Sequence, residues 1–199
     1  MNDVLVDRKA WIKTEIITVA VVTGLLLVLC LGLPVFTQNV TSTWYRNYNQ
    51  YLIGPLVNAA LIYSGLRFKK VYNVIGVILM PSICVAVLGL IGINAIFMIY
   101  MIPFIWLGNM AIVFSFRLMF RKNKNKTVRY VITAILGVGL KVSIIFCAFL
   151  VLRSFGVFPG PVAERLYTMM GVVQFITATC GAVIAFGAVR LHRTKLLHS

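Results

Sequence analysis

Six long apolar segments follow one another along the chain, and polar or basic residues gather in the short stretches between them. A hydrocarbon core about 30 Å thick is crossed by about 20 apolar residues in helical form. The pattern therefore predicts an all-α integral membrane protein with six transmembrane helices. The expected spans are residues 11–36, 51–66, 71–90, 95–120, 128–154 and 162–191.

The second segment is the shortest, because residues 51–66 fall below the roughly 17–25 residues that a spanning helix uses. We expect irregular backbone at its ends, with Gly54 and Pro55 at a helix start or a kink. Pro81 and Pro103 are each expected to remove one backbone hydrogen bond, inside the third and fourth spans.

Composition and charge bound the class of protein. The chain has 199 residues, of which 61% are hydrophobic, and is read as a single transmembrane domain, residues 1–199. Its net charge of +15 comes from Lys and Arg in short clusters between the apolar segments. That distribution is typical of loops beside anionic lipid, so no nucleic-acid partner is expected.

The positions of the basic residues predict the orientation. Of the 19 Lys and Arg residues, 15 fall on one side of the predicted membrane, and Arg46, Arg153 and Arg165 fall on the other. The positive-inside rule then places both termini in the cytoplasm. The first outer connection, residues 37–50, contains Trp44, whose ring is expected either in an interfacial aromatic belt or in a lid over a pocket.

Lys141 is the candidate functional residue that stands out most. It lies in the middle of the span 128–154, roughly 20 Å from either end of a helix and near the membrane midplane. Such a placement costs about 2.5–3.5 kcal/mol on insertion scales. The four acidic residues all fall near span ends, so the lysine is neutral, solvated in a cavity, bound by amides and carbonyls, or matched by an anionic ligand. A purely structural role is the alternative to a functional one.

Other polar and aromatic residues fall at a similar depth. Amide oxygens of Asn58, Asn109 and Gln174 are candidate acceptors for Lys141, and Trp106 lies close to Asn109 in the sequence. Together they suit a small-molecule pocket, with Trp44 as a further stacking candidate. The predicted ligand-binding residues are Lys141, Asn109, Gln174, Asn58, Trp106 and Trp44.

Small residues recur at helical spacing on two spans. Thr177, Gly181 and Ala185 follow one another every four residues, which predicts close helix packing inside the protein. Ala20 and Gly24 do so on the first span and are expected to face another subunit. The four cysteines are isolated, so neither a metal site nor a cofactor is expected.

Several short stretches resemble a known family. Residues 54–59, 102–109, 140–141 and 173–178 look like those of small six-helix bacterial membrane proteins that often carry the label "iron hydrogenase". Scattered cysteines cannot hold an iron–sulfur cluster, so that label does not fit this chain. In size and layout the family is similar to the substrate-binding S components of energy-coupling-factor (ECF) vitamin transporters.

The resemblance implies a six-helix bundle with cytoplasmic termini and an outward-facing pocket capped by the connection between the first two helices. It also implies a small-residue face on the first helix, Ala20 and Gly24 here, that docks a transmembrane scaffold subunit driven by two ATPases. The chain itself has no phosphate-cradling GxxxxGK[ST] loop.

The sequence thus predicts a substrate-capture subunit of an ATP-driven micronutrient importer in the bacterial cytoplasmic membrane. It would bind a small molecule, for which an anion is one candidate, without catalysing a reaction. The alternative is a non-transport membrane scaffold or assembly protein, in which the same polar residues only hold helices together.

Overall fold

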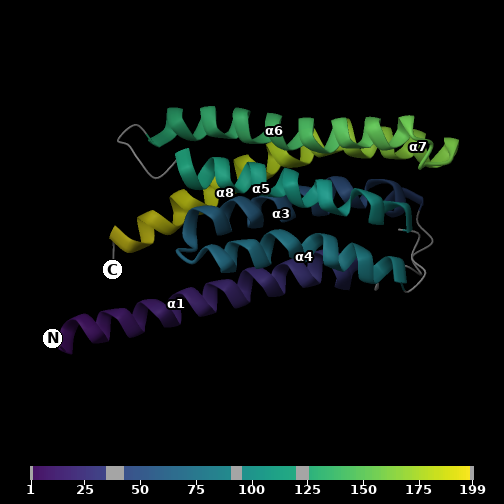
Figure 1. Cartoon of the computed structure of the whole chain (residues 1–199). Helices are drawn as coiled ribbons and strands as arrows, with labels where there is room; N and C mark the ends of the chain where they lie inside the picture. Colours follow the sequence, from purple (N-terminus) through teal and green to yellow (C-terminus); the bar gives the residue numbers. More distant parts are fainter. Residues whose placement is uncertain (1, 35–42, 91–95, 120–125, 198–199) are drawn as a thin grey trace.

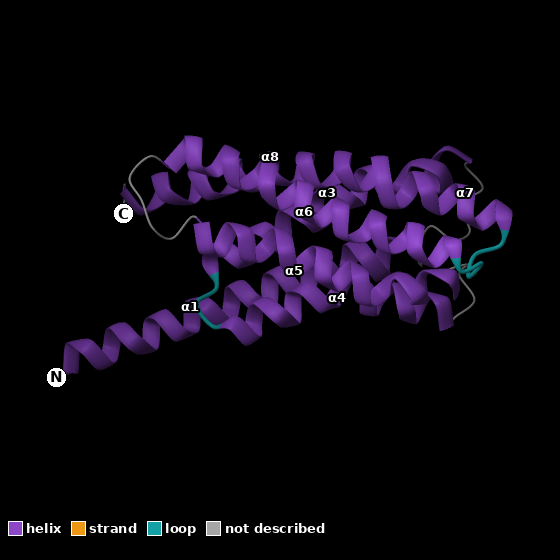
Figure 2. Ribbon diagram, turned by 45° about the horizontal axis from the view of Figure 1, so that its top comes forward, coloured by secondary structure: helices purple, strands orange, loops and turns teal. Residues whose placement is uncertain are grey.

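The computed structural model describes residues 2–34, 43–90, 96–119 and 126–197, and these ranges contain helices and turns but no strand (Figure 2). Within them, the side chains of residues 2–12, 43–49, 85, 88–90, 96–98, 126 and 191–197 are not described. The elements are α1 (Asn2–Leu27), η1 (Val28–Gly32), α3 (Thr43–Arg67), α4 (Val71–Leu90), η2 (Ile96–Met101), α5 (Ile102–Met119), α6 (Lys126–Ser154), α7 (Gly160–Thr168), η3 (Met169–Val173) and α8 (Gln174–Leu197).

The long helices lie lengthwise beside one another, so that the molecule has two distinct ends (Figure 1). Both chain termini lie at one end, together with the turn between α3 and α4 and the start of α6. The short helix α7 lies at the opposite end. The ends of the chain therefore share a side, as a protein with an even number of crossings requires.

Four described helical segments are long and apolar enough to cross a membrane: Lys13–Gly32, Ile99–Met119, Thr127–Ser154 and Gly160–Arg190. Val71–Cys84 in α4 is a shorter apolar helix, and α3 is not in this set. The helical class and the presence of several membrane-crossing candidates are thus confirmed. Six crossings remain an expectation, to which α3 and α4 would have to contribute.

The expected helix start at Gly54 and Pro55 is wrong. α3 has 25 residues, begins at Thr43 and includes Pro55 in its interior, so the Gly54–Pro55 step is not a helix start. Proline removes its N–H from the helical hydrogen-bond ladder and its ring crowds the carbonyl four residues earlier, yet α3 continues past Pro55. The polar residues 43–50, predicted to belong to a connection, form the first two turns of α3.

The other spans agree more closely with the prediction, with local differences. α4 matches residues 71–90, and α6 begins two residues before the predicted 128–154. Residues 96–101 form a 3-10 helix, so Pro103 lies in the first turn of α5, where N–H groups have no partner within the helix. The sixth span contains a five-residue π-helical segment, η3, directly before Gln174.

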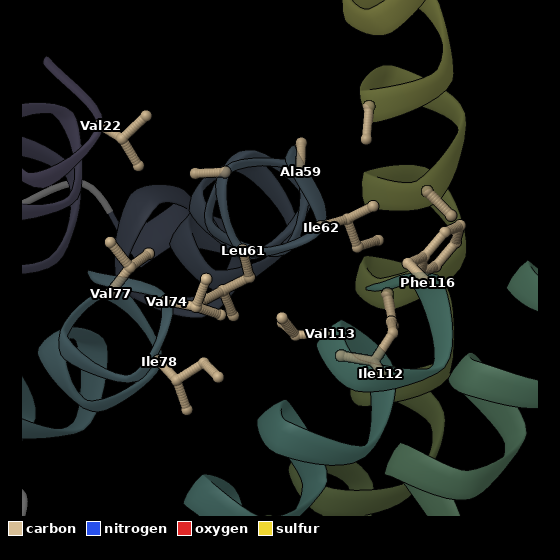
Figure 3. Close-up of a cluster of buried hydrophobic side chains, with 14 of the residues drawn as sticks. Val22, Ala59, Leu61, Ile62, Val74, Val77, Ile78, Ile112, Val113 and Phe116 are labelled. Carbon is tan, nitrogen blue, oxygen red and sulfur yellow. The ribbon is translucent and has the colours of Figure 1, made fainter. Parts of the chain in front are cut away.

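α3 lies at the centre of the larger apolar core. Figure 3 shows Leu61 and Ile62 of α3 among Val74 and Val77 of α4 and Val113 of α5. α1 contributes Val22 and Leu26, and α8 contributes Ala178, Ala182 and Ala185. α3 thus buries its Ala59–Ile62 segment against neighbouring helices, while Leu52 and Leu56 remain exposed.

Glycines bring α8 into close contact with α3. A Cβ atom added to Gly54 would lie 2.7 Å from Thr177 Cγ2, and one added to Gly181 would lie 2.5 Å from Asn58 Cβ. Thr177, Gly181 and Ala185 are all buried, so the predicted internal face of small residues is confirmed. These contacts fix the register between the two helices at the level of Asn58.

The end of α6 is closed by hydrogen bonds from the turn that follows it. Gly156 has a φ of +71°, a left-handed conformation that glycine adopts readily. Its N–H donates to Arg153 O at 3.0 Å, and the N–H of Val157 donates to Leu152 O at 3.2 Å. This pair of bonds is the Schellman motif, which supplies donors to the last carbonyls of the helix.

Tyr130 joins α6 to α8 and gives a first testable prediction. Its hydroxyl donates to Ala182 O at 2.7 Å, and its ring lies between Phe116 and Phe186. Tyr130→Phe should lower the free energy of unfolding by about 1 kcal/mol, the typical value of one such bond. Unfolding in mixed SDS micelles measures this, with Tyr167→Phe, at an exposed ring, as the matched control. Equal stability of the two variants would contradict the bond.

Candidate functional site

The site is built around Lys141, which lies near the middle of α6. Its side chain is only 3% exposed, in a helix whose neighbouring residue Leu140 is half exposed. Lys141 therefore points into the bundle rather than toward the surroundings. A buried ammonium needs hydrogen-bond acceptors from other helices.

Asn58 of α3 supplies the acceptor. Lys141 Nζ donates to Asn58 Oδ1 at 2.5 Å, and Asn58 itself is 4% exposed. The amide nitrogen Nδ2 of Asn58 donates to Gly54 O at 2.9 Å and approaches Thr177 Oγ1 of α8 at 3.5 Å. The bond to Gly54 fixes the orientation of the amide, so that its oxygen faces the lysine. One amide thereby connects α3, α6 and α8.

Close backbone contacts hold these helices in register. Gly181 of α8 lies against Asn58, and Gly108 of α5 lies against α6. A Cβ atom at Gly108 would lie 2.8 Å from Ile145 side-chain atoms and 3.2 Å from Lys141 O. α5 thus comes closest to α6 beside Lys141, and Asn109 follows Gly108 at the same level.

Two polar atoms near this level have no hydrogen-bond partner within the described protein. One is Oδ1 of Asn109, whose side chain is 3% exposed, and the other is Nε1 of Trp106. Leaving a buried polar atom unpaired costs about 1–3 kcal/mol, so each such atom calls for an explanation. Asn109 presents an acceptor and Trp106 a donor, three residues apart on one face of α5.

The remaining predicted residues are less closely connected to Lys141. Gln174 begins α8 directly after η3, and its main-chain O accepts the Thr177 hydroxyl at 3.3 Å. Trp44 belongs to the first turn of α3, and its side chain is not among those that the structure describes. On α1, Ala20 is exposed and Gly24 has open space around it, so the pair lies on an outer face of the bundle.

Carboxylates lie far from the lysine. Asp3 and Asp7 belong to the N-terminal part of α1, which extends beyond the bundle (Figure 1). Glu15 accepts from the Lys70 main-chain N–H at 3.2 Å and from Asn73 Nδ2 at 3.1 Å, and Glu164 pairs with Arg153 at 2.8 Å. In the part of the chain that the structure describes, the hydrogen-bond partner of Lys141 Nζ is therefore the neutral amide of Asn58 and not a carboxylate.

Thr177 is the member of this cluster that sequence reasoning assigned only to helix packing. Thr177 lies three residues after Gln174 on the helix face that continues to Gly181. This position could have marked it as a member of the polar cluster. The π-helical segment η3 was not predicted. Such segments add a residue to a helical turn and are frequent at functional sites.

Comparison with known proteins adds no relative. Neither the protein-family models, nor the curated proteins, nor the solved structures contain a match to this chain. The assignment of function therefore rests on the residues and the geometry described above.

Proposed function

We propose that the chain is a membrane-embedded binding subunit that captures a small anionic molecule at Lys141. The observation that carries this proposal is a lysine, 3% exposed in the middle of a long apolar helix, whose described partner is the neutral amide of Asn58. A neutral amide accepts a hydrogen bond but does not cancel a positive charge. A bound carboxylate or phosphate would do both.

The mechanism is binding without covalent chemistry. The anionic group of the ligand takes hydrogen bonds from Lys141 Nζ, either beside Asn58 Oδ1 or in place of it. The unpaired Oδ1 of Asn109 accepts a hydrogen bond from the same molecule, and the unpaired Nε1–H of Trp106 donates one to it. Because Asn58, Lys141 and Thr177 come from three helices, binding also changes how firmly these helices hold together.

The proposed role in transport, with its orientation and partner subunits, rests on the resemblance to ECF S components. In that setting the basic end, with both termini, faces the cytoplasm of a bacterial cell, and the ligand enters from the opposite end. A transmembrane scaffold subunit docks at Ala20 and Gly24, on the outer face of α1, and two ATPase subunits supply the energy. The protein itself would be neither an enzyme nor an ATPase.

A second candidate function has an observation in its favour. Asn58 connects three helices, and the glycine contacts on either side of it fix their register. That is the arrangement expected if the polar residues hold together a non-transport scaffold or assembly protein. The two functions differ in whether a small molecule occupies the site.

Native mass spectrometry separates the two functions. The protein is purified in mild detergent from its natural membrane, and we expect one small anionic molecule bound to each wild-type chain. Lys141→Met should lose that molecule while remaining folded, because methionine keeps the length of the side chain and removes its charge. Lys13→Met, at an exposed lysine of α1, is the matched control and should keep the molecule.

The outcomes are distinct. A bound molecule in the wild type and the Lys13→Met control, and none in folded Lys141→Met, supports the capture subunit. A wild type without any small molecule, or a molecule that Lys141→Met retains, favours the scaffold.

A further inference from the structure

A separate candidate site lies at the end of the bundle that carries both chain termini (Figure 1). It is a cavity of about 360 Å³ beside the turn between α3 and α4, and its lining includes Arg67, Lys69 and Arg117. This volume lies within the range of about 300–1,000 Å³ that small-molecule sites occupy. Among the described residues, the lining contains three cationic residues and no acidic one, so their summed formal charge is positive.

Arg117 of α5 fixes the shape of this cavity. Its guanidinium donates to Phe68 O and Lys69 O, both at 2.6 Å, and lies 3.5 Å from Gly65 O. Gly65 lies in the last turn of α3, where a helix carries unpaired C=O groups and a partial negative charge, and Phe68 and Lys69 directly follow the helix. Arg117 supplies the donors and offsets that partial charge, and Arg67 and Lys69 add two further cationic residues to the lining.

The position of the cavity suits an amphiphilic anion. Arg117 lies two residues before the end of the candidate membrane-crossing helix Ile99–Met119, and therefore at the edge of the apolar region. Leu66, Phe68 and Phe116 add apolar walls beside the cations. A soluble anion would use only the charge of such a site, whereas a lipid would use the charge and the apolar walls.

We propose that this cavity binds the phosphodiester head group of an anionic lipid from the leaflet at the basic end of the protein. Cationic sites between helices at this depth suit such head groups because charge attraction and apolar contact act together. The proposal does not depend on a ligand at Lys141, which lies about halfway along α6.

Lipid binding to delipidated protein in a neutral detergent tests the proposal, with native mass spectrometry as the readout. We expect the wild type to bind one phosphatidylglycerol more tightly than phosphatidylcholine. Each cation near a lipid head group contributes about fivefold in affinity, so Arg67→Gln with Lys69→Gln should weaken phosphatidylglycerol binding about 25-fold. Both changes leave the bonds of Arg117 to main-chain carbonyls in place.

The matched control removes two cations outside the cavity, with Lys13→Gln and Arg129→Gln, and should keep the wild-type affinity. Lys69→Arg keeps the charge at residue 69 and should also keep the wild-type affinity for phosphatidylglycerol. It provides a second test if the double variant fails to fold. Equal weakening in the control, or loss of binding in Lys69→Arg, would overturn a charged site at this cavity. Inorganic phosphate that binds as tightly as phosphatidylglycerol would overturn the assignment to lipid.

Discussion

Asn58→Leu is expected to destabilise the protein more than Lys141→Met, although both variants remove the same hydrogen bond. Leucine at residue 58 leaves the Lys141 ammonium buried without its acceptor, and losing a bond to a charged group costs about 1.5–3 kcal/mol. Methionine at residue 141 leaves only a neutral amide oxygen unpaired. It also removes the cost of burying an ammonium inside the bundle, so its net effect on the free energy of unfolding should be close to zero.

A double-mutant cycle makes this prediction quantitative. The free energies of unfolding of the wild type, the two single variants and the double variant are measured in mixed SDS micelles. Asn58→Leu should cost less in the Lys141→Met background than in the wild type, because the bond to the charged group is already gone and only the contacts of Asn58 Nδ2 with Gly54 O and Thr177 Oγ1 remain to be lost. If the two changes in the free energy of unfolding are additive, or if Lys141→Met loses more stability than Asn58→Leu, the two side chains are not coupled in this way.

Gly181→Ala is expected to lower the free energy of unfolding by about 1–3 kcal/mol, the usual cost of overfilling a packed interface. The added Cβ would lie 2.5 Å from Asn58 Cβ, 2.9 Å from Pro55 O and 3.0 Å from Ala59 N. Main-chain and Cβ atoms cannot rotate out of the way, so α8 must move away from α3. Because the shift displaces Asn58, this variant should also lose the small molecule expected at Lys141.

The control for this prediction lies on the same helix. Gly187 has no atom within 4 Å of the position that a Cβ would take, so Gly187→Ala should be neutral or should stabilise α8 by up to about 1 kcal/mol. A comparable loss of stability in both variants would show that α8 tolerates no alanine in general. It would remove the special role of the contact between Gly181 and Asn58.

The fold was predictable from the sequence where an apolar segment is bounded by polar residues. α4 and α6 fit that description, and their predicted and observed bounds agree within two residues. α3 does not fit it, because its first two turns are polar and its Pro55 is a typical helix breaker. Only the surrounding helices, which provide α3 with apolar contacts along Leu61 and Ile62, make that long helix stable.

The candidate site was predictable in part, for a reason specific to membrane proteins. Depth in a membrane follows from position along a helix, so Asn58 and Lys141 could be placed at one level before their contact was known. Rotation of one helix against another does not follow in that way. The contact between Asn58 and Thr177 and the closeness of Gly108 to Lys141 depend on the register between helices.

The most direct test of the central claim is to return the small molecule to the site. The molecule released from the wild-type protein by denaturation is added to ligand-free protein, and its binding is followed by tryptophan fluorescence and calorimetry. We expect one molecule per chain, and an affinity at least about 30-fold lower for Lys141→Met, since a charge-assisted hydrogen bond contributes about 2 kcal/mol. Equal affinities for the two proteins, or no released molecule at all, would contradict the account.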